Sequence, residues 1–253
     1  MTRFEQRYEQ DVLNAVSLRG SVTVEELAAL LGVSGQTVRR VVRPMAERGE
    51  LTKVHGAILA VEKAGEPPFL ARMNLNHRAK VAIATAVAGL IADGDSLALD
   101  VGSTTGFIAQ ALRQHRNLNV VTNSSFIATS LATIPGNRVH MAGVELRNHD
   151  GAAFDRRAFE TVRGFRVRYA VLSASAVHPT HGFMVHDHCE AEMSGTMASV
   201  ADTRIVAVDH SKFGRSALLT LPILQPGDIL VTDAKPPRGF SRVLKDLTVH
   251  VAL

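Results

Sequence analysis

The sequence predicts an α/β protein, in which an N-terminal winged helix-turn-helix precedes a larger, mainly parallel α/β domain. Up to residue 61, amphipathic helical segments are separated by glycines and followed by two alternating strands. From residue 77 onward, short apolar runs alternate with helical segments, the pattern of a parallel sheet covered on both faces. Between these parts, Gly65, Pro67 and Pro68 are typical of a linker. We therefore expect domains at 1–61 and 77–253, joined by a linker at 62–76.

The N-terminal domain begins with three predicted helices. The first covers Phe4 to Leu18, an amphipathic stretch. Thr23 and Glu26 have the spacing of a capping box that begins the second helix, and Gly32 suits the position just past its end. Ser34 follows as the N-cap of the third helix. Short helices joined by a tight glycine turn are the arrangement that places a recognition helix in the major groove of DNA.

The third helix and the following hairpin carry the side chains expected to contact DNA. Between Arg39 and Lys53, five basic residues stand against two acidic ones. Arginine and glutamine can bond base edges in pairs, and serine and threonine can bond bases or phosphates. Strands at 51–54 and 57–61 predict a two-stranded wing. The predicted DNA-binding residues are Ser34, Gln36, Thr37, Arg39, Arg40, Arg43, Lys53 and His55. A helical bundle that binds another protein is the alternative.

The composition favours a cytoplasmic protein that does not enter the membrane. The single cysteine, Cys189, excludes an intramolecular disulfide and suits a reducing compartment. The segment from Met1 to Gln10 is too charged for a signal peptide. The apolar segment from Val81 to Ala92 is shorter than the ~20 residues that span a bilayer. The formal net charge of +4 supports a polyanionic partner, because part of it gathers on the third helix.

The second domain is expected to bind a ligand beyond the carboxyl ends of its strands. Its predicted elements are a helix at 77–92 and strands at 96–100, 119–122, 138–142, 169–173, 205–209 and 229–233. Ligands of open α/β sheets bind at that edge of the sheet. Glycine, hydroxyl and amide groups follow the first two strands, and Lys212 and Arg215 follow the fifth. Backbone amides, hydroxyls and cations in such turns suit a phosphate.

The stretch from His178 to Glu190 concentrates histidine and acidic residues. One interpretation is a metal site, but Cys-x-x-Cys and His-Glu-x-x-His spacings are both missing. The other is a polar loop in which Asp187 and Glu190 accept hydrogen bonds from sugar or polyol hydroxyls. We expect this second case, with no metal and no cofactor. The predicted effector-binding residues are Asp100, Gly102, Ser103, Thr104, Thr105, Asn123, Ser124, Asp187, Glu190 and Lys212.

Several motifs together resemble the DeoR family of transcriptional repressors. The stretch from Val22 to Gly56 resembles its N-terminal domain, and LALDVGSTTG, VVTNS, MAGVELR, VDHSKFGR and VTDAKPP resemble its sensor domain in the same order. The resemblance implies a sensor shaped like ribose-5-phosphate isomerase and repression of a carbohydrate or polyol catabolic operon. It also implies release from operator DNA by a phosphorylated metabolite, and a homodimer or homotetramer. The runs AVDHSKFGRSAL, AGVELRNHDG and GFMVHDHCE are most similar to members that respond to glycerol 3-phosphate.

The sequence departs from the family pattern at a few positions. Pro44 lies inside the third helix and is expected to kink or end it. Ser194 and Gly195 stand where basic residues are common in the family, which points to a ligand of different shape or charge. An isomerase-like enzyme is the rival interpretation, but Ser175 and Ala176 occupy the region of that family's acids and neither can act as a base. We expect no catalytic residues and no enzyme activity.

Overall fold

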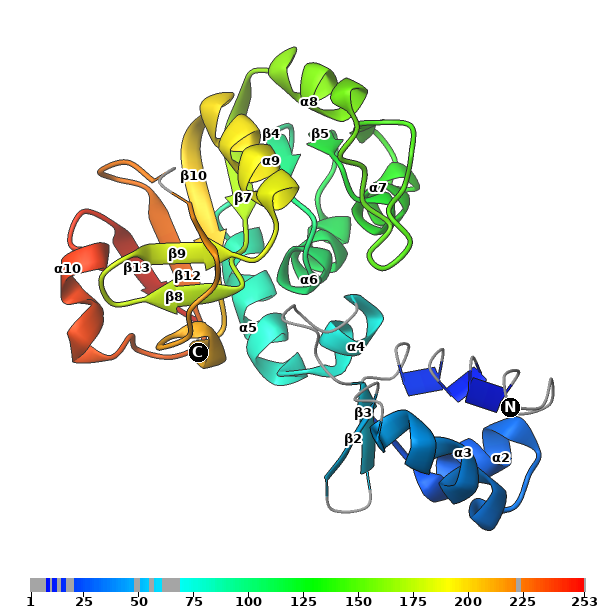
Figure 1. Cartoon of the computed structure of the whole chain (residues 1–253). Helices are drawn as coiled ribbons and strands as arrows, with labels where there is room; N and C mark the ends of the chain where they lie inside the picture. Colours follow the sequence, from blue (N-terminus) through cyan, green and yellow to red (C-terminus); the bar gives the residue numbers. More distant parts are fainter. Residues whose placement is uncertain are drawn as a thin grey trace. The chain divides into compact units, whose positions relative to one another are not determined.

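The structure is a computed structural model that describes residues 8–9, 11–12, 15–16, 21–47, 51–54, 57–60, 69–221 and 224–252. The chain divides into two compact units, Met1–Leu75 and Asn76–Leu253 (Figure 1). The first contains the predicted helix-turn-helix and the second the predicted sheet. None of the described helices combines the length and apolar character that crossing a bilayer requires.

The helix-turn-helix forms as predicted, with α2 at Val24–Leu31 and α3 at Gly35–Glu47. The capping box is present, because Thr23 Oγ1 accepts a hydrogen bond from Glu26 N at 3.1 Å while Thr23 N donates to Glu26 Oε2 at 2.8 Å. Gly32 ends α2 at a φ of 64°, a left-handed conformation that glycine adopts without steric cost. In the predicted first helix, the described residues are helical.

The wing has one strand more than predicted. β2 (Leu51–Val54) and β3 (Ala57–Ala60) pair antiparallel, as the alternation indicated. β1 (Ser21–Thr23) pairs antiparallel with the other edge of β3, which gives the strand order β1-β3-β2. A strand of three residues leaves too short a pattern to recognise without its partner.

Pro44 does not end the recognition helix, so that half of the expectation is wrong. The α3 helix continues through Pro44 to Glu47. Pro44 is exposed, so the carbonyl that loses its intrahelical donor lies on the solvent side. The opposite face holds the helix in place, because Val38, Val42 and Met45 are fully buried against α2 and the N-terminal residues.

The second unit is built on a seven-stranded, all-parallel sheet of order β13-β12-β10-β7-β4-β5-β6. Its strands are β4 (Ser96–Leu99), β5 (Asn119–Thr122), β6 (Arg138–Met141), β7 (Val167–Leu172), β10 (Ala201–Ala207), β12 (Ile229–Thr232) and β13 (Thr248–Val251). The first six were predicted, with boundaries that differ by a few residues. β13 was missed, since all four of its residues are exposed and it has no buried apolar run.

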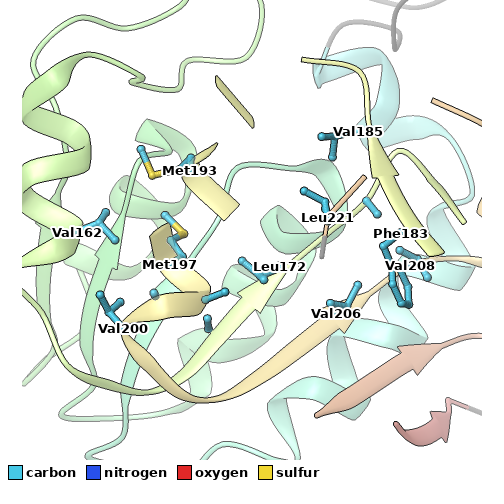
Figure 2. Packing of buried hydrophobic residues seen from close by; sticks show 14 of the residues in the cluster. Val162, Leu172, Phe183, Val185, Met193, Met197, Val200, Val206, Val208 and Leu221 are labelled. Atoms are coloured by element: carbon cyan, nitrogen blue, oxygen red, sulfur yellow. The ribbon is translucent and has the colours of Figure 1, made fainter. Parts of the chain in front are cut away.

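Helices cover both faces of the sheet. The helices are α5 (His77–Ala88), α6 (Ser103–Ala111), α7 (Ser125–Ala132), α8 (Arg156–Arg163) and α9 (His188–Ser199). Leu172 of β7 and Val206 of β10 pack with Met193 and Met197 of α9, in one core cluster that also includes Val162 of α8 (Figure 2). Successive side chains of a strand point to opposite faces. The intervening residues therefore face the other layer, where α5 contacts β10 and β12 and packs on α6.

The second unit also contains a small antiparallel sheet, of order β11-β9-β8. Its strands are β8 (Ala176–His178), β9 (Gly182–Val185) and β11 (Leu219–Thr220). The polar loop expected from His178 to Glu190 is wrong in part, because His178 ends β8, Gly182–Val185 form β9 and α9 begins at His188. Phe183 and Val185 join the core (Figure 2). The remaining helices include α4 (Phe69–Asn74), the short turn η2 (His210–Lys212) and α10 (Ser241–Leu244).

Candidate functional sites

The exposed face of α3 carries the predicted DNA-reading side chains. Gln36, Arg39, Arg40 and Arg43 are exposed, whereas the apolar residues of the same helix are buried. Ser34 precedes the helix and accepts a hydrogen bond from Thr37 N at 3.2 Å. The helix therefore presents three guanidinium groups and one amide to solvent from a backbone that its buried face holds in place.

Two of these arginines have weak partners that DNA can replace. Arg39 lies 3.9 Å from Glu25, and Arg43 lies 3.0 Å from Glu47, with all four side chains more than half exposed. Exposed ion pairs of this kind contribute about 0–1 kcal/mol. Lys53 lies in β2. His55 lies outside the described residues, so its predicted role stays a prediction.

The predicted effector site lies at the switch point of the sheet. From β4 the chain runs through β5 to β6 in one direction, and from β7 through β10 and β12 to β13 in the other. Ligands of open α/β sheets bind where the strand order reverses, here between β4 and β7. Gly102 follows β4, and a Cβ on it would lie 2.5 Å from Ser173 Oγ at the end of β7. A side chain at position 102 would therefore require the Ser173 hydroxyl to move.

The turn after β4 opens α6 with three hydroxyl side chains. Ser103, Thr104 and Thr105 form its first turn and are buried. Thr105 Oγ1 donates to the carbonyl of Gly102 at 2.9 Å, which fixes the turn. The amides of a first helical turn have no intrahelical acceptor and carry the positive end of the helix dipole. This turn therefore has the donors that an anion needs.

Asp100 and Asn123 extend two neighbouring strands on the face covered by α8 and α9. Leu99 pairs with Thr122, which places these two residues side by side just past the strand ends. Asn123 is fully buried, donates weakly to the carbonyl of Ala153 at 3.4 Å, and its Oδ1 has no described hydrogen-bond partner. Ser124, the next residue, caps α7 through Ile127 N at 3.4 Å.

Asp100 is a buried acid with a raised pKa. It accepts hydrogen bonds from Ser194 Oγ at 2.5 Å and from Val101 N at 2.8 Å. Burial, assisted by the charges of Glu190 and Asp150, raises the pKa of Asp100 to about 7, even though both hydrogen bonds lower it. The site thus holds a carboxyl group that changes its charge near neutral pH.

Arg147, which sequence reasoning did not select, ties the acidic residues of this region together. Its guanidinium donates to Asp187 at 2.9 Å, to Glu190 at 2.8 Å and to Asp150 at still shorter range. It also stacks on Phe154, with Cζ 4.2 Å from the ring centroid. Burial lowers the pKa of Arg147, but the hydrogen bonds and charges of Asp150 and Glu190 raise it more. Arg147 therefore stays charged.

The predicted hydroxyl acceptors Asp187 and Glu190 are thus occupied by a protein cation in this structure. Asp187 also caps α9 by accepting from Cys189 N at 3.3 Å. Burial raises the pKa of Asp187, but the hydrogen bonds from Cys189 and the charge of Arg147 hold it below its ordinary value. Burial and Asp187 raise the pKa of the Cys189 thiol to about 11. Within the described residues, no group of three or more His, Cys, Asp or Glu side chains could hold a metal ion.

Lys212 belongs to η2, the turn that follows β10. One strand, β7, separates β10 from β4 in the sheet, so Lys212 stands across the switch point from Asp100. The turn is held by Asp209, which accepts from Ser211 N at 2.9 Å, and by Asp233, whose two oxygens each bond His210 at 2.6 Å. The structure thus brings Asp100, Asn123 and the α6 turn together, and places Lys212 at the same edge of the sheet.

Both units match known protein families. Residues 9–64 match the DeoR-like helix-turn-helix domain, and residues 75–234 match the DeoR C-terminal sensor domain. The chain belongs to the DeoR family. This DeoR-family chain is 30% identical to the glycerol-3-phosphate regulon repressor of Escherichia coli K12 over 96% of both chains. It is 33% identical to the HTH-type transcriptional repressor CsqR of the same organism, over 98% of this chain and 94% of that one.

Solved structures also match part of this DeoR-family chain, at low identity. A D-ribose-5-phosphate isomerase in complex with phospho-erythronic acid is 19% identical, with a TM-score of 0.40 over 54% of each chain. The translation initiation factor eIF-2B of Pyrococcus horikoshii OT3 is 22% identical, with a TM-score of 0.40 over 61% of this chain and 53% of that chain.

Proposed function

We propose that this protein is a cytoplasmic transcriptional repressor of a carbohydrate or polyol catabolic operon, released from its operator by a phosphorylated metabolite. The proposal rests on the presence, in one chain, of two units that each match a DeoR-family domain. One exposes an arginine-rich recognition helix, and the other gathers polar groups at the switch point of a parallel sheet. The relatives are named as repressors. The sign of regulation also depends on where the operator lies, so activation at some promoters is compatible with the same site.

On the DNA side, the recognition helix would enter a major groove. Arg39 and Arg40 would hold guanines or phosphates, and Gln36 and Thr37 would help to read bases. Lys53 and His55 of the wing would contact the backbone. A homodimer or homotetramer would place recognition helices in successive grooves, because half-sites of such operators lie one helical turn, or a multiple of it, apart.

On the effector side, the phosphate would bind at the first turn of α6, with Asn123 and Ser124 beside it and Lys212 supplying charge. The amides and hydroxyls of Ser103 and Thr104 suit an anion there. The acidic residues around Arg147 do not suit a phosphate, because they outnumber the guanidinium. That side of the site would instead meet the hydroxyl-bearing end of the ligand, which can donate to Asp100.

Glycerol 3-phosphate is the first effector to test, because the chain resembles a glycerol-3-phosphate regulon repressor along nearly its whole length. A different sugar phosphate is the alternative, supported by Ser194. This residue contacts Asp100 where a basic residue would give the site another charge. An isomerase is less well supported, since the relatives are named repressors and Ser175 and Ala176 offer no general base after β7.

The test is fluorescence anisotropy with DNA from upstream of the protein's own gene. We expect binding that weakens as salt rises, because phosphate contacts release counterions. We then expect release by glycerol 3-phosphate or by one member of a panel of sugar phosphates. Release by another phosphate would keep the repressor and change its effector. No DNA binding at low salt, or turnover of ribose 5-phosphate above background, would contradict the proposal.

A further inference from the structure

Asn76, the first residue of the sensor unit, is tied to the loop that follows β10. Its Nδ2 donates to Asp209 Oδ1 at 3.1 Å and to Ser211 Oγ at 3.0 Å. Asp209 is only 1% exposed. Its Oδ1 also accepts from Ser211 N, so both acceptors belong to one braced turn. These bonds join positions that are more than 130 residues apart in the sequence.

Asn76 does not use its side chain in the way its position suggests. It is the N-cap of α5, where an asparagine usually accepts a hydrogen bond from an amide of the first turn. Here the side chain makes no such bond. The backbone of Asn76 has a φ of 51°, a left-handed conformation that is uncommon for residues other than glycine but is several-fold enriched for asparagine. Such a conformation persists when its surroundings hold it, and the bonds to Asp209 and Ser211 are part of those surroundings.

The turn that holds Asn76 also contains a residue of the proposed effector site. Lys212 follows Ser211 directly, in the three-residue turn η2. His210, at the start of that turn, is bonded to Asp233 through both its backbone and its ring. Ser211 and Lys212 are consecutive residues of this turn, so their positions are linked through the backbone. A ligand that draws Lys212 toward itself therefore changes the positions of the groups to which Asn76 is bonded.

We propose that Asn76 is a positioning residue that transmits occupancy of the effector site to the chain that enters the DNA-binding unit. In the DNA-competent state, Asn76 is bonded to Asp209 and Ser211. Ligand binding at Lys212 shifts η2, breaks these bonds and releases Asn76 from the left-handed conformation. The backbone of Asn76, where the chain enters the sensor unit, can then adopt another conformation. The inference rests on the proposed function, because it requires a ligand that lowers DNA affinity.

The state that loses the Asn76 bonds is the state that the ligand prefers. Coupling between two ligands is reciprocal, so the same equilibrium lowers DNA affinity when ligand binds and lowers ligand affinity when DNA binds. Removing the bonds by substitution should therefore imitate the ligand in part. DNA affinity without ligand should fall, and ligand affinity without DNA should hold or rise. General damage to the fold would instead lower both affinities.

The experiment compares Asn76→Gly with a matched control, Asn117→Gly. Glycine keeps the left-handed backbone available but removes the side-chain bonds. Asn117 is also left-handed, with a φ of 59°, and lies before β5 at the opposite edge of the sheet. The measured quantity is the ratio of the DNA dissociation constants with and without saturating glycerol 3-phosphate, or the panel member that releases the wild type. Natural couplings of this kind are about 5–150-fold.

We expect the ratio to fall at least about fivefold in Asn76→Gly and to stay at the wild-type value in Asn117→Gly. Ser211→Ala, which removes one of the two acceptors, should give an intermediate ratio and provides a second route if Asn76→Gly does not fold. If Asn76→Gly and Ser211→Ala both kept the wild-type ratio, this inference would be overturned and the proposed function would stand. Equal losses in Asn76→Gly and Asn117→Gly would have the same consequence. Failure of every probe to release the wild-type protein would overturn the proposed function, and this inference with it.

Discussion

Replacement of the buried acid Asp100 by asparagine should remove a large part of the pH dependence of stability. Asp100 is fully buried in the sensor unit, and its pKa rises from 3.8 to about 7. Asparagine fits the same place, because its Oδ1 can accept from Val101 N while its Nδ2 donates to a reoriented Ser194 hydroxyl. The substitution therefore changes the titration while it keeps the hydrogen bonds.

Proton linkage gives the sign and the size of the change that Asp100 makes to the free energy of unfolding as pH rises. Between pH 3.8 and about 7, the unfolded chain has lost the Asp100 proton while the folded protein keeps it. The unfolded state then binds fewer protons, so the free energy of unfolding falls as pH rises through this range and levels off above it. At ~1.36 kcal/mol per pH unit, the wild type should lose about 3 kcal/mol between pH 5 and pH 8 that Asp100→Asn retains.

Urea unfolding followed by circular dichroism at pH 5 and pH 8 measures this difference. All other titrating groups are shared by the two proteins, so they cancel when the variant is compared with the wild type. Asp202→Asn, a substitution of the same type at an exposed position of β10, serves as the control and should follow the wild type. If the stability difference between Asp100→Asn and the wild type were the same at both pH values, the reasoning about Asp100 would be refuted.

Three further substitutions test other parts of the molecule. Arg39→Ala should weaken operator binding about 10–100-fold and reduce its salt dependence, with effector binding intact. Arg156→Ala, an exposed arginine of α8, is the control, and equal loss in both would refute the docking. Lys212→Ala should raise the effector concentration needed for release about 10–100-fold, because a charge-assisted bond is lost. Full induction in that variant would remove Lys212 from the site. Asp228→Ala should cost about 3–5 kcal/mol in urea unfolding by leaving Arg204 buried and unpaired, and a cost below 1 kcal/mol would contradict this.

Local signals in the sequence were sufficient for much of the fold. The capping box at Thr23 and Glu26, the glycine end of α2 and the cap at Ser34 are short-range interactions, and each is present. Five strands of the main sheet were recognised because their buried residues form apolar runs. The sixth, β6, was recognised as well, although it is an edge strand with no buried residue. The strands β1, β8, β9, β11 and β13 were missed. β1 is three residues long, and β13 is an exposed edge strand, so both exist only because a neighbouring strand pairs with them.

The candidate effector site was less accessible from the sequence. Its strand-end residues could be placed by topology, because parallel strands end at one edge. The role of Arg147 could not, since a single arginine in an irregular segment has no pattern, and two of its acidic partners lie 40 and 43 residues away. Asp187 and Glu190 looked free to meet a ligand because that partner was unknown. The one signal available was a surplus of carboxylates, which predicts a cation nearby without identifying it.

The position of β4 in the middle of the sheet affects how the chain folds as it is synthesised. One neighbour of β4, β5, follows after about twenty residues, but its other neighbour is β7, near residue 170. The central pairing of the sensor must therefore wait until two thirds of the polypeptide has been made. The helix-turn-helix relies on contacts that are close in sequence, and such contacts form fastest. The nascent protein thus completes its DNA-binding unit well before its sensor unit. Until β7 is made, the edge of β4 that β7 will cover stays exposed, and chaperones would protect such a surface.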